Sequence, residues 1–166
     1  FNYTILVSSS IISFYLIPVY LLHFLNNQKL NSISKNINLK DLVPFFIISL
    51  IAILMFVFFD YNYKIGGGFF LKLSRLIFDN SIFFLVTSVI GLFMVYDLIK
   101  EDKENLFLTL ILLLGFSYHM IFQKYFEPMF LFIYLFMINS KIKDKFLKNS
   151  KSLFFFKMYF LIYLFM

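Results

Sequence analysis

The sequence predicts an all-α fold, a polytopic transmembrane helix bundle of about six membrane segments plus a short interfacial helix. Of the 166 residues, 61% are hydrophobic and 14% are charged, whereas soluble domains have about half apolar and about a quarter charged residues. Apolar runs of about twenty residues, the length of a membrane-crossing helix, recur along the chain. The two-residue alternation typical of membrane barrels is absent from the sequence.

Each expected membrane helix coincides with an apolar run between polar residues. These runs are residues 4–25, 42–59, 81–98, 106–122, 128–139, and 152 to the end of the chain. Helices are expected because they satisfy their own backbone groups in lipid. No hydrophilic stretch is long enough for a soluble domain, so residues 1–166 are expected to form one integral membrane domain. Phe1 is not an initiator Met, and we expect a fragment of a longer chain whose N-terminal part is missing.

The fourth and fifth segments are short and flank the polar stretch "QKYFEP", residues 123–128. Seventeen helical residues span only ~25 Å, less than the ~30 Å hydrocarbon core. We therefore expect a hairpin whose turn lies slightly below the outer surface, buried in protein or facing a watery cavity. Pro128 disfavours helical geometry at Glu127, which agrees with a turn. The alternative is one long helix over residues 106–139, kinked at Pro128.

Basic residues predict the orientation of the chain. The loops at residues 26–41, 97–105 and 139–152 carry ten lysines, whereas the other two loops carry three lysines and one arginine. Lysine-rich loops face the cytoplasm, so Phe1 is expected outside. The mixed charges of residues 97–104 predict a solvated turn, and the five lysines of residues 139–152 predict a loop that fixes topology.

The stretch "DYNYKIGGGFFLKLSRLIFDN", residues 60–80, predicts a short amphipathic helix in the outer interface. Gly66 to Gly68 form a flexible joint, and the apolar residues that follow recur at helical spacing. Lys72 and Arg75 are three residues apart and share one face. This helix either anchors the chain to lipid headgroups or binds the phosphate of a lipid-linked substrate. The forked guanidinium of Arg75 can donate two parallel hydrogen bonds to a phosphate.

A second group of polar side chains surrounds the expected hairpin turn. Polar groups at membrane depth indicate function, and Glu127 suits a base or a hydroxyl acceptor. Lys124 suits a phosphate as a point charge, and His119 titrates near neutral pH. Tyr125 stands beside them. The simpler interpretation is a helix–helix turn in which Lys124 extends to the surface and Tyr125 joins the aromatic belt.

Composition and missing motifs exclude several classes of function. The chain has no Cys, which excludes disulfides and thiolate chemistry. It has no Walker or nucleophile-elbow motif and no pattern of metal ligands. The net charge of +6 resides in short loops, so we expect no nucleic-acid partner. Abundant Phe, Ile, Lys, Asn and Tyr indicate AT-rich codons, so we expect a bacterial inner-membrane protein whose partners include membrane lipids.

The outer stretch "GGGFFLKLSRLIF", followed two segments later by "YHMIFQKYFEP", resembles the late region of bacterial polytopic glycosyltransferases of the GT-C class. The resemblance covers about residues 63–139. The residues that match the polar tip of that family are His119, Lys124, Tyr125, Glu127 and Pro128.

The resemblance implies a sugar transferase that uses a polyprenyl-phosphate-linked donor at the outer face of the membrane. In that class the catalytic acidic residue lies in the first outer loop, which would be upstream of Phe1, so no catalytic residue is assigned. The class often needs a divalent metal, and no ligand for a metal or other cofactor is identifiable here. The resemblance and the local charge make Lys72, Arg75, His119, Lys124, Tyr125 and Glu127 the candidates for binding lipid phosphate or sugar. The alternatives are a transporter or polymerase for lipid-linked oligosaccharides, and a non-catalytic membrane scaffold.

Overall fold

The computed structural model describes residues 2–26, 39–61, 66–115 and 121–165, and this part of the chain is all-α. The helices are α1 (Asn2–Asn26), α3 (Leu39–Val57), α4 (Gly68–Phe78), α5 (Ile82–Glu101), α6 (Asn105–Leu114), α7 (Gln123–Phe132), the π-helical η1 (Ile133–Met137), α8 (Lys141–Lys148) and α9 (Ser150–Phe165). The predicted all-α class is confirmed.

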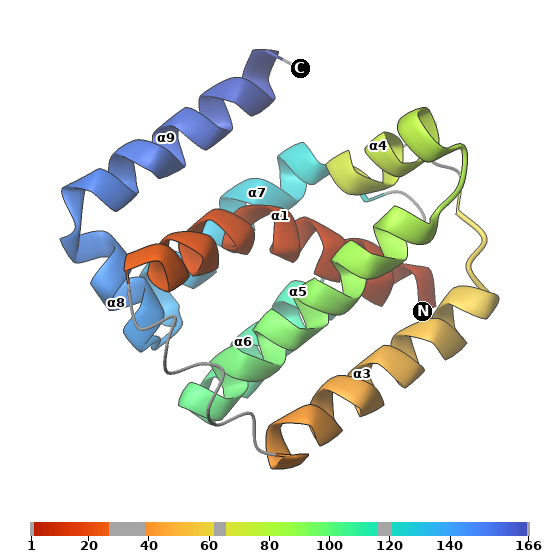
Figure 1. Cartoon of the computed structure of the whole chain (residues 1–166), viewed down its shortest axis with the longest axis horizontal. Helices are drawn as coiled ribbons and strands as arrows, with labels where there is room; N and C mark the ends of the chain where they lie inside the picture. The colour runs from red at the N-terminus through yellow and green to blue at the C-terminus, as the bar shows by residue number, and fades with distance from the viewer. Residues whose placement is uncertain (1, 27–38, 62–65, 116–120, 166) are drawn as a thin grey trace.

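Helix α1 runs through the middle of the bundle, between α3 and α9 at opposite edges (Figure 1). It packs on α3, α4, α5, α6, α8 and α9. Aromatic stacking fixes α9 among these neighbours and adds α7, because the Tyr15 ring lies 5.4 Å from that of Phe160 on α9 and 5.1 Å from that of Phe130 on α7. Most of its side chains before the last turn are therefore buried.

Small residues allow α1 and α5 to approach closely, as helices in lipid commonly do. Ser10 Oγ and Thr87 Oγ1 share a hydrogen bond of 3.2 Å, and Ser88 Oγ donates to the carbonyl of Leu6 at 2.9 Å. Gly91 completes the contact, since a Cβ placed there would lie 1.9 Å from the carbonyl oxygen of Ser9. The two helices are held by van der Waals contact and hydrogen bonds between their small residues.

Two helices among the described residues are long and apolar enough to cross a membrane, Tyr3–Leu25 and Ile82–Glu101. Leu42–Val57 and Asn105–Leu114 are apolar but shorter. The structure therefore has a helix at each of the six predicted positions, and it establishes two candidate membrane spans rather than six.

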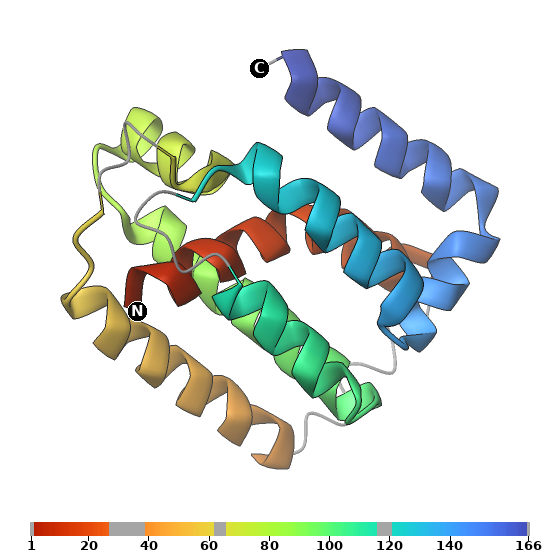
Figure 2. The same ribbon diagram turned by 180° about the vertical axis from the view of Figure 1, so that it is seen from behind.

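The prediction of a turn at residues 123–128 is wrong. These residues form the first turns of α7, with Phe122 extended as the N-cap and Pro128 inside the helix. The rings of Phe126, Phe130 and Tyr134 stack in succession along the buried face. Burying these rings requires helical geometry through residue 128, and Pro128 is tolerated because it lies on the exposed side of α7. In the view from behind, α7 and α6 lie in front of α1 and α5 (Figure 2).

The lysine-rich stretch was predicted to be a loop, and it contains helix α8 instead. Ser140 caps this helix by accepting a hydrogen bond from Lys143 N at 3.4 Å. Phe146 is buried, and its ring packs edge-on against Phe156 of α9 at 5.3 Å. The apolar residues of this short stretch thus have a protein surface to cover, which favours a helix over a solvated loop.

A buried asparagine joins α6 to the chain that follows η1. Asn105 Nδ2 donates to the carbonyls of Leu98 (2.8 Å) and Asn139 (2.7 Å), and its Oδ1 accepts from Asn139 N at 3.0 Å. Glu101 accepts from Lys141 N at 3.0 Å beside it. Part of the predicted solvated turn at residues 97–104 is consequently engaged with protein. This polar junction lies at the opposite end of α5 from helix α4.

Candidate functional site

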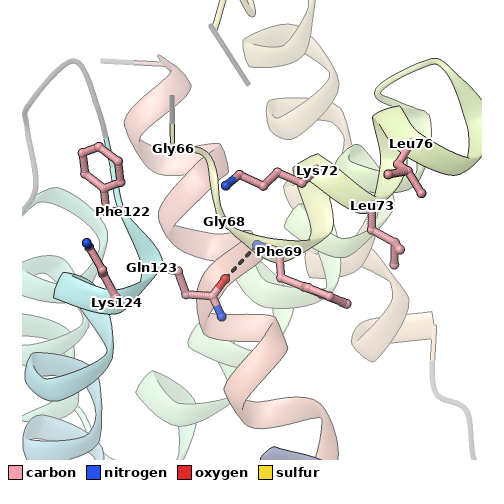
Figure 3. Close-up of a pocket in the computed structure, with 9 residues that line it drawn as sticks. All are labelled: Gly66, Gly68, Phe69, Lys72, Leu73, Leu76, Phe122, Gln123 and Lys124. Carbon is pink, nitrogen blue, oxygen red and sulfur yellow. Dashed lines mark hydrogen bonds between the residues drawn. The ribbon is translucent and has the colours of Figure 1, made fainter. Parts of the chain in front are cut away.

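The two polar elements singled out from the sequence, the 60–80 stretch and the start of α7, meet around one cavity of about 570 Å³ (Figure 3). It is lined by Gly66, Gly68, Phe69, Lys72, Leu73, Leu76, Phe122, Gln123 and Lys124. One wall is the N-terminal half of α4, and the other is the extended residue Phe122 with the first turn of α7.

Three consecutive glycines form the edge of the cavity where the chain enters α4. Gly66, Gly67 and Gly68 have φ angles of 105°, 86° and 76°, a region that favours glycine. The Gly67 N–H donates to the carbonyl of Ile121 at 2.9 Å, which joins this glycine segment to the chain just before α7. A Cβ at Gly66 would lie 2.8 Å from both the Ile121 carbonyl oxygen and the Tyr61 hydroxyl. The triple glycine is thus required by close approach rather than by flexibility.

Tyr61 supports this junction from the loop after α3. Its hydroxyl accepts a hydrogen bond from Ile121 N at 2.8 Å. Burial raises the pKa of the Tyr61 hydroxyl above its ordinary value, and the neighbouring N–H groups of Ile121 and Gly67 partly oppose that rise. The hydroxyl is therefore neutral at physiological pH and acts as a structural acceptor.

Gln123 ties the two walls together. Its Oε1 accepts a hydrogen bond from Phe69 N at 2.7 Å, in the first turn of α4 (Figure 3). Its Nε2 donates to the Tyr15 hydroxyl at 3.3 Å. The first N–H groups of a helix have no partner within the helix. A side chain from α7 thus supplies an acceptor to α4 and fixes its N-terminus at the cavity.

Two lysines place positive charge on opposite walls. Lys72 extends from α4 and Lys124 from α7, and both line the cavity (Figure 3). The Lys124 ammonium also lies 4.9 Å from the centroid of the Tyr125 ring and 6.0 Å from that of Phe122, within cation–π range. The N-terminal end of α4 adds the partial positive charge of a helix dipole. The cavity therefore favours an anion.

The remaining lining is apolar and partly exposed. Phe69, Leu73, Leu76 and Phe122 surround the charged groups, and Leu76 and Phe122 are 84% and 37% exposed. Positive charge bordered by exposed apolar side chains suits an amphiphilic anion better than a small soluble one.

The structure separates the six residues predicted for the site. It brings Lys72 and Lys124 together. Arg75 is half-buried one turn further along α4, Tyr125 is exposed, and Glu127 is half-buried on α7; none of these three lines the cavity. His119, with Tyr118 beside it, lies outside the described residues.

Sequence reasoning missed Gln123, the residue that connects α4, α7 and α1. A polar amide at the first position of a helix that buries Phe126 and Phe130 was the available signal. The described residues contain no group of three His, Cys, Asp or Glu side chains that could hold a metal ion. This part of the chain does not fit the divalent metal that the GT-C resemblance implies.

Comparison of the chain with protein-family models, with curated proteins and with solved structures gives no match.

Proposed function

We propose that this chain is part of an integral membrane glycosyltransferase that uses a polyprenyl-phosphate-linked sugar donor to build a cell-surface polysaccharide or glycolipid. In this proposal the cavity between α4 and α7 binds the phosphate of the donor. The observation that carries it is the convergence of Lys72 and Lys124 on a cavity whose rim is apolar.

The apolar surface beside the cavity is suited to the lipid part of such a donor. Leu76, Ile77 and Phe78 at the end of α4 are all more than half exposed, and Ile82 at the start of α5 is 62% exposed. A polyprenyl chain on this surface would keep its phosphate near the lysines. The volume of about 570 Å³ lies within the ~300–1,000 Å³ of ordinary ligand sites.

The membrane arrangement belongs to the same proposal. It has six membrane segments in a bacterial inner membrane, with Phe1 and the cavity on the outer side. The charge bias of the loops supports this orientation. The separation of the cavity from the polar junction at Asn105 supports it as well, because these features lie at opposite ends of α5.

The chemical role of the lysines follows from where charge develops. When the bond between the anomeric carbon and the phosphate oxygen breaks, its electron pair leaves on that oxygen. Lys72 and Lys124 would stabilise this anion. The acceptor hydroxyl oxygen forms the new bond to carbon, and its proton passes to the catalytic carboxylate that the GT-C resemblance places upstream of Phe1. Glu127, three residues after Lys124 on α7, or His119 is the proposed residue for orienting the acceptor.

Binding of polyprenyl phosphate by the purified full-length protein, measured by microscale thermophoresis, tests the proposal. We expect Lys72→Gln and Lys124→Gln each to weaken binding by roughly tenfold, about 1.4 kcal/mol, because each removes one charge-assisted hydrogen bond. Lys157→Gln is the matched control, because this exposed lysine on α9 does not line the cavity. The neutral polyprenol should bind all variants alike.

Transfer of sugar from the lipid-linked donor is the second measurement. Both lysine variants should lose transfer in proportion to their loss of phosphate binding. Wild-type affinity and transfer in the double variant would refute the proposal. If the wild type binds the phosphate but transfers no sugar, and the lysine variants lose that binding, the cavity remains a lipid-phosphate site. That result would favour a transporter of lipid-linked oligosaccharides.

A further inference from the structure

The five lysines between residues 141 and 151 have two different environments. Lys143 points into the protein and is 7% exposed, whereas Lys141, Lys145, Lys148 and Lys151 are exposed. The sequence shows them as one run of charge. The structure divides them into one residue that holds α8 in place and four that face outward.

Lys143 anchors α8 to the end of η1. Its ammonium donates to the carbonyl of Leu135 at 3.3 Å and to that of Ile138. Carbonyls at a helix C-terminus carry partial negative charge and lack intrahelical donors, so a cation is favourable there. With Phe146 buried on the same side, this contact fixes which face of α8 is turned outward.

The outward face is basic. Lys141, Lys145 and Lys148 are spaced four and three residues apart and share one side of the helix. Asp144 is the one acidic residue of α8. Lys151 extends the charge into the first turn of α9.

The basic face ends abruptly at an apolar surface. Phe154 and Phe155, which follow Lys151 on α9, are each 62% exposed, and Met158 is 42% exposed. Exposed lysines followed within one helical turn by exposed phenylalanines are the pattern expected where a chain passes from headgroups to hydrocarbon. This pattern would place the surface of a bilayer between residues 151 and 154.

We propose that the outward face of α8 is a binding surface for the headgroups of anionic phospholipids. The helix lies along the bilayer surface, with Lys143 and Phe146 on the protein and Lys141, Lys145 and Lys148 on the lipid phosphates. This inference stands independently of the cavity between α4 and α7, from which α8 is separated by the length of α7 and η1.

The test compares phosphatidylglycerol with phosphatidylcholine as added lipids for the purified protein in a neutral detergent. The measurement is the number of lipids retained and their apparent affinity by native mass spectrometry, with thermal stabilisation as a second readout. Near an anionic surface each lysine contributes about fivefold in affinity. Lys141→Gln, Lys145→Gln and Lys148→Gln together should weaken phosphatidylglycerol binding by roughly a hundredfold and leave phosphatidylcholine unchanged.

Three further variants make the outcome decisive. Replacing the same three lysines with Arg should retain binding, because the charge is kept. Lys157→Gln on α9 should also retain it, although it removes a charge elsewhere. The double variant Lys72→Gln, Lys124→Gln tests whether the lipid binds at the cavity instead. Equal retention of the two lipids by the wild type, or unchanged phosphatidylglycerol affinity in the triple Gln variant, would overturn the inference. Loss of binding in the cavity variant alone would overturn it too, and would assign the lipid to the cavity.

Discussion

Gly91→Ala tests whether the contact between α1 and α5 holds the bundle together. The new Cβ would lie 1.9 Å from the Ser9 carbonyl oxygen, where ordinary contact begins at 3.4 Å. The helices would have to separate by about 1.5 Å, the difference between these distances. The hydrogen bonds from Ser10 to Thr87 (3.2 Å) and from Ser88 (2.9 Å) to α1 would then stretch beyond bonding range.

The expected loss can be estimated from three contributions. Overpacking a tight site costs about 1–3 kcal/mol, and two interhelical hydrogen bonds contribute about 0.6 kcal/mol each. Ala improves helix propensity over Gly by about 1 kcal/mol. We therefore expect Gly91→Ala to lower the free energy of unfolding by about 2 kcal/mol, measured by SDS titration in mixed micelles with circular dichroism.

Val86→Ile is the matched control, since Val86 lies on α5 with 49% of its surface exposed and also gains one carbon. It should change stability by less than about 0.5 kcal/mol. A Gly91→Ala protein as stable as the wild type, or more stable, would show that α1 and α5 do not pack as described.

Two further predictions concern the polar junction at the far end of α5. Asn105→Ala should lower the free energy of unfolding by about 2 kcal/mol in the same SDS titration, because it leaves the buried carbonyl of Leu98 and the partly buried backbone groups of Asn139 without their partner. A loss below about 0.5 kcal/mol would contradict the junction. Hydrogen bonds from the Glu104 N–H, which has the larger effect, and from the Asn139 side chain hold the pKa of Asp102 below its ordinary 3.8. The ionised Asp102 therefore stabilises the fold above pH 3.8, and this stabilisation is lost as the pH falls through the folded-state pKa. Thermal unfolding between about pH 2 and pH 6 should therefore depend less on pH in Asp102→Asn than in the wild type, and identical profiles would contradict the assignment.

Hydrophobic runs predicted the helices well because their signal is local. The segment expected at residues 81–98 corresponds to Ile82–Glu101, and that expected at residues 42–59 corresponds to Leu39–Val57. The amphipathic pattern around Lys72 correctly indicated the helix Gly68–Phe78. In each case composition and spacing within the segment determine the element, whatever it packs against.

The prediction of a turn failed where two local signals opposed each other. Pro128 suggested a turn, but the stacking of Phe126, Phe130 and Tyr134 requires one continuous helical element. The four-residue spacing of these aromatic side chains is visible in the sequence. The predicted turn rested instead on the tendency of a residue before proline to avoid helical geometry.

The candidate site was predicted only in part, because contacts between distant parts of the sequence complete it. The two stretches that meet there could be picked out by their polar residues, and Lys72 and Lys124 were among the candidates. The role of Gln123 depends on Phe69, 54 residues away, and on Tyr15, 108 residues away. Neither contact can be inferred from the spacing of residues along the chain.

The central position of α1 has a consequence for the order of events during synthesis. Its partners on α5 come 77 and 82 residues later in the chain. At about 5–20 residues per second, translation leaves α1 without them for roughly 4–15 s. Two of its serines have local acceptors for that interval, since Ser9 donates to the Leu6 carbonyl at 3.0 Å and Ser13 to the Ser10 carbonyl at 2.7 Å. Helix α1 can thus keep these hydroxyls satisfied by its own backbone until α5 arrives beside it.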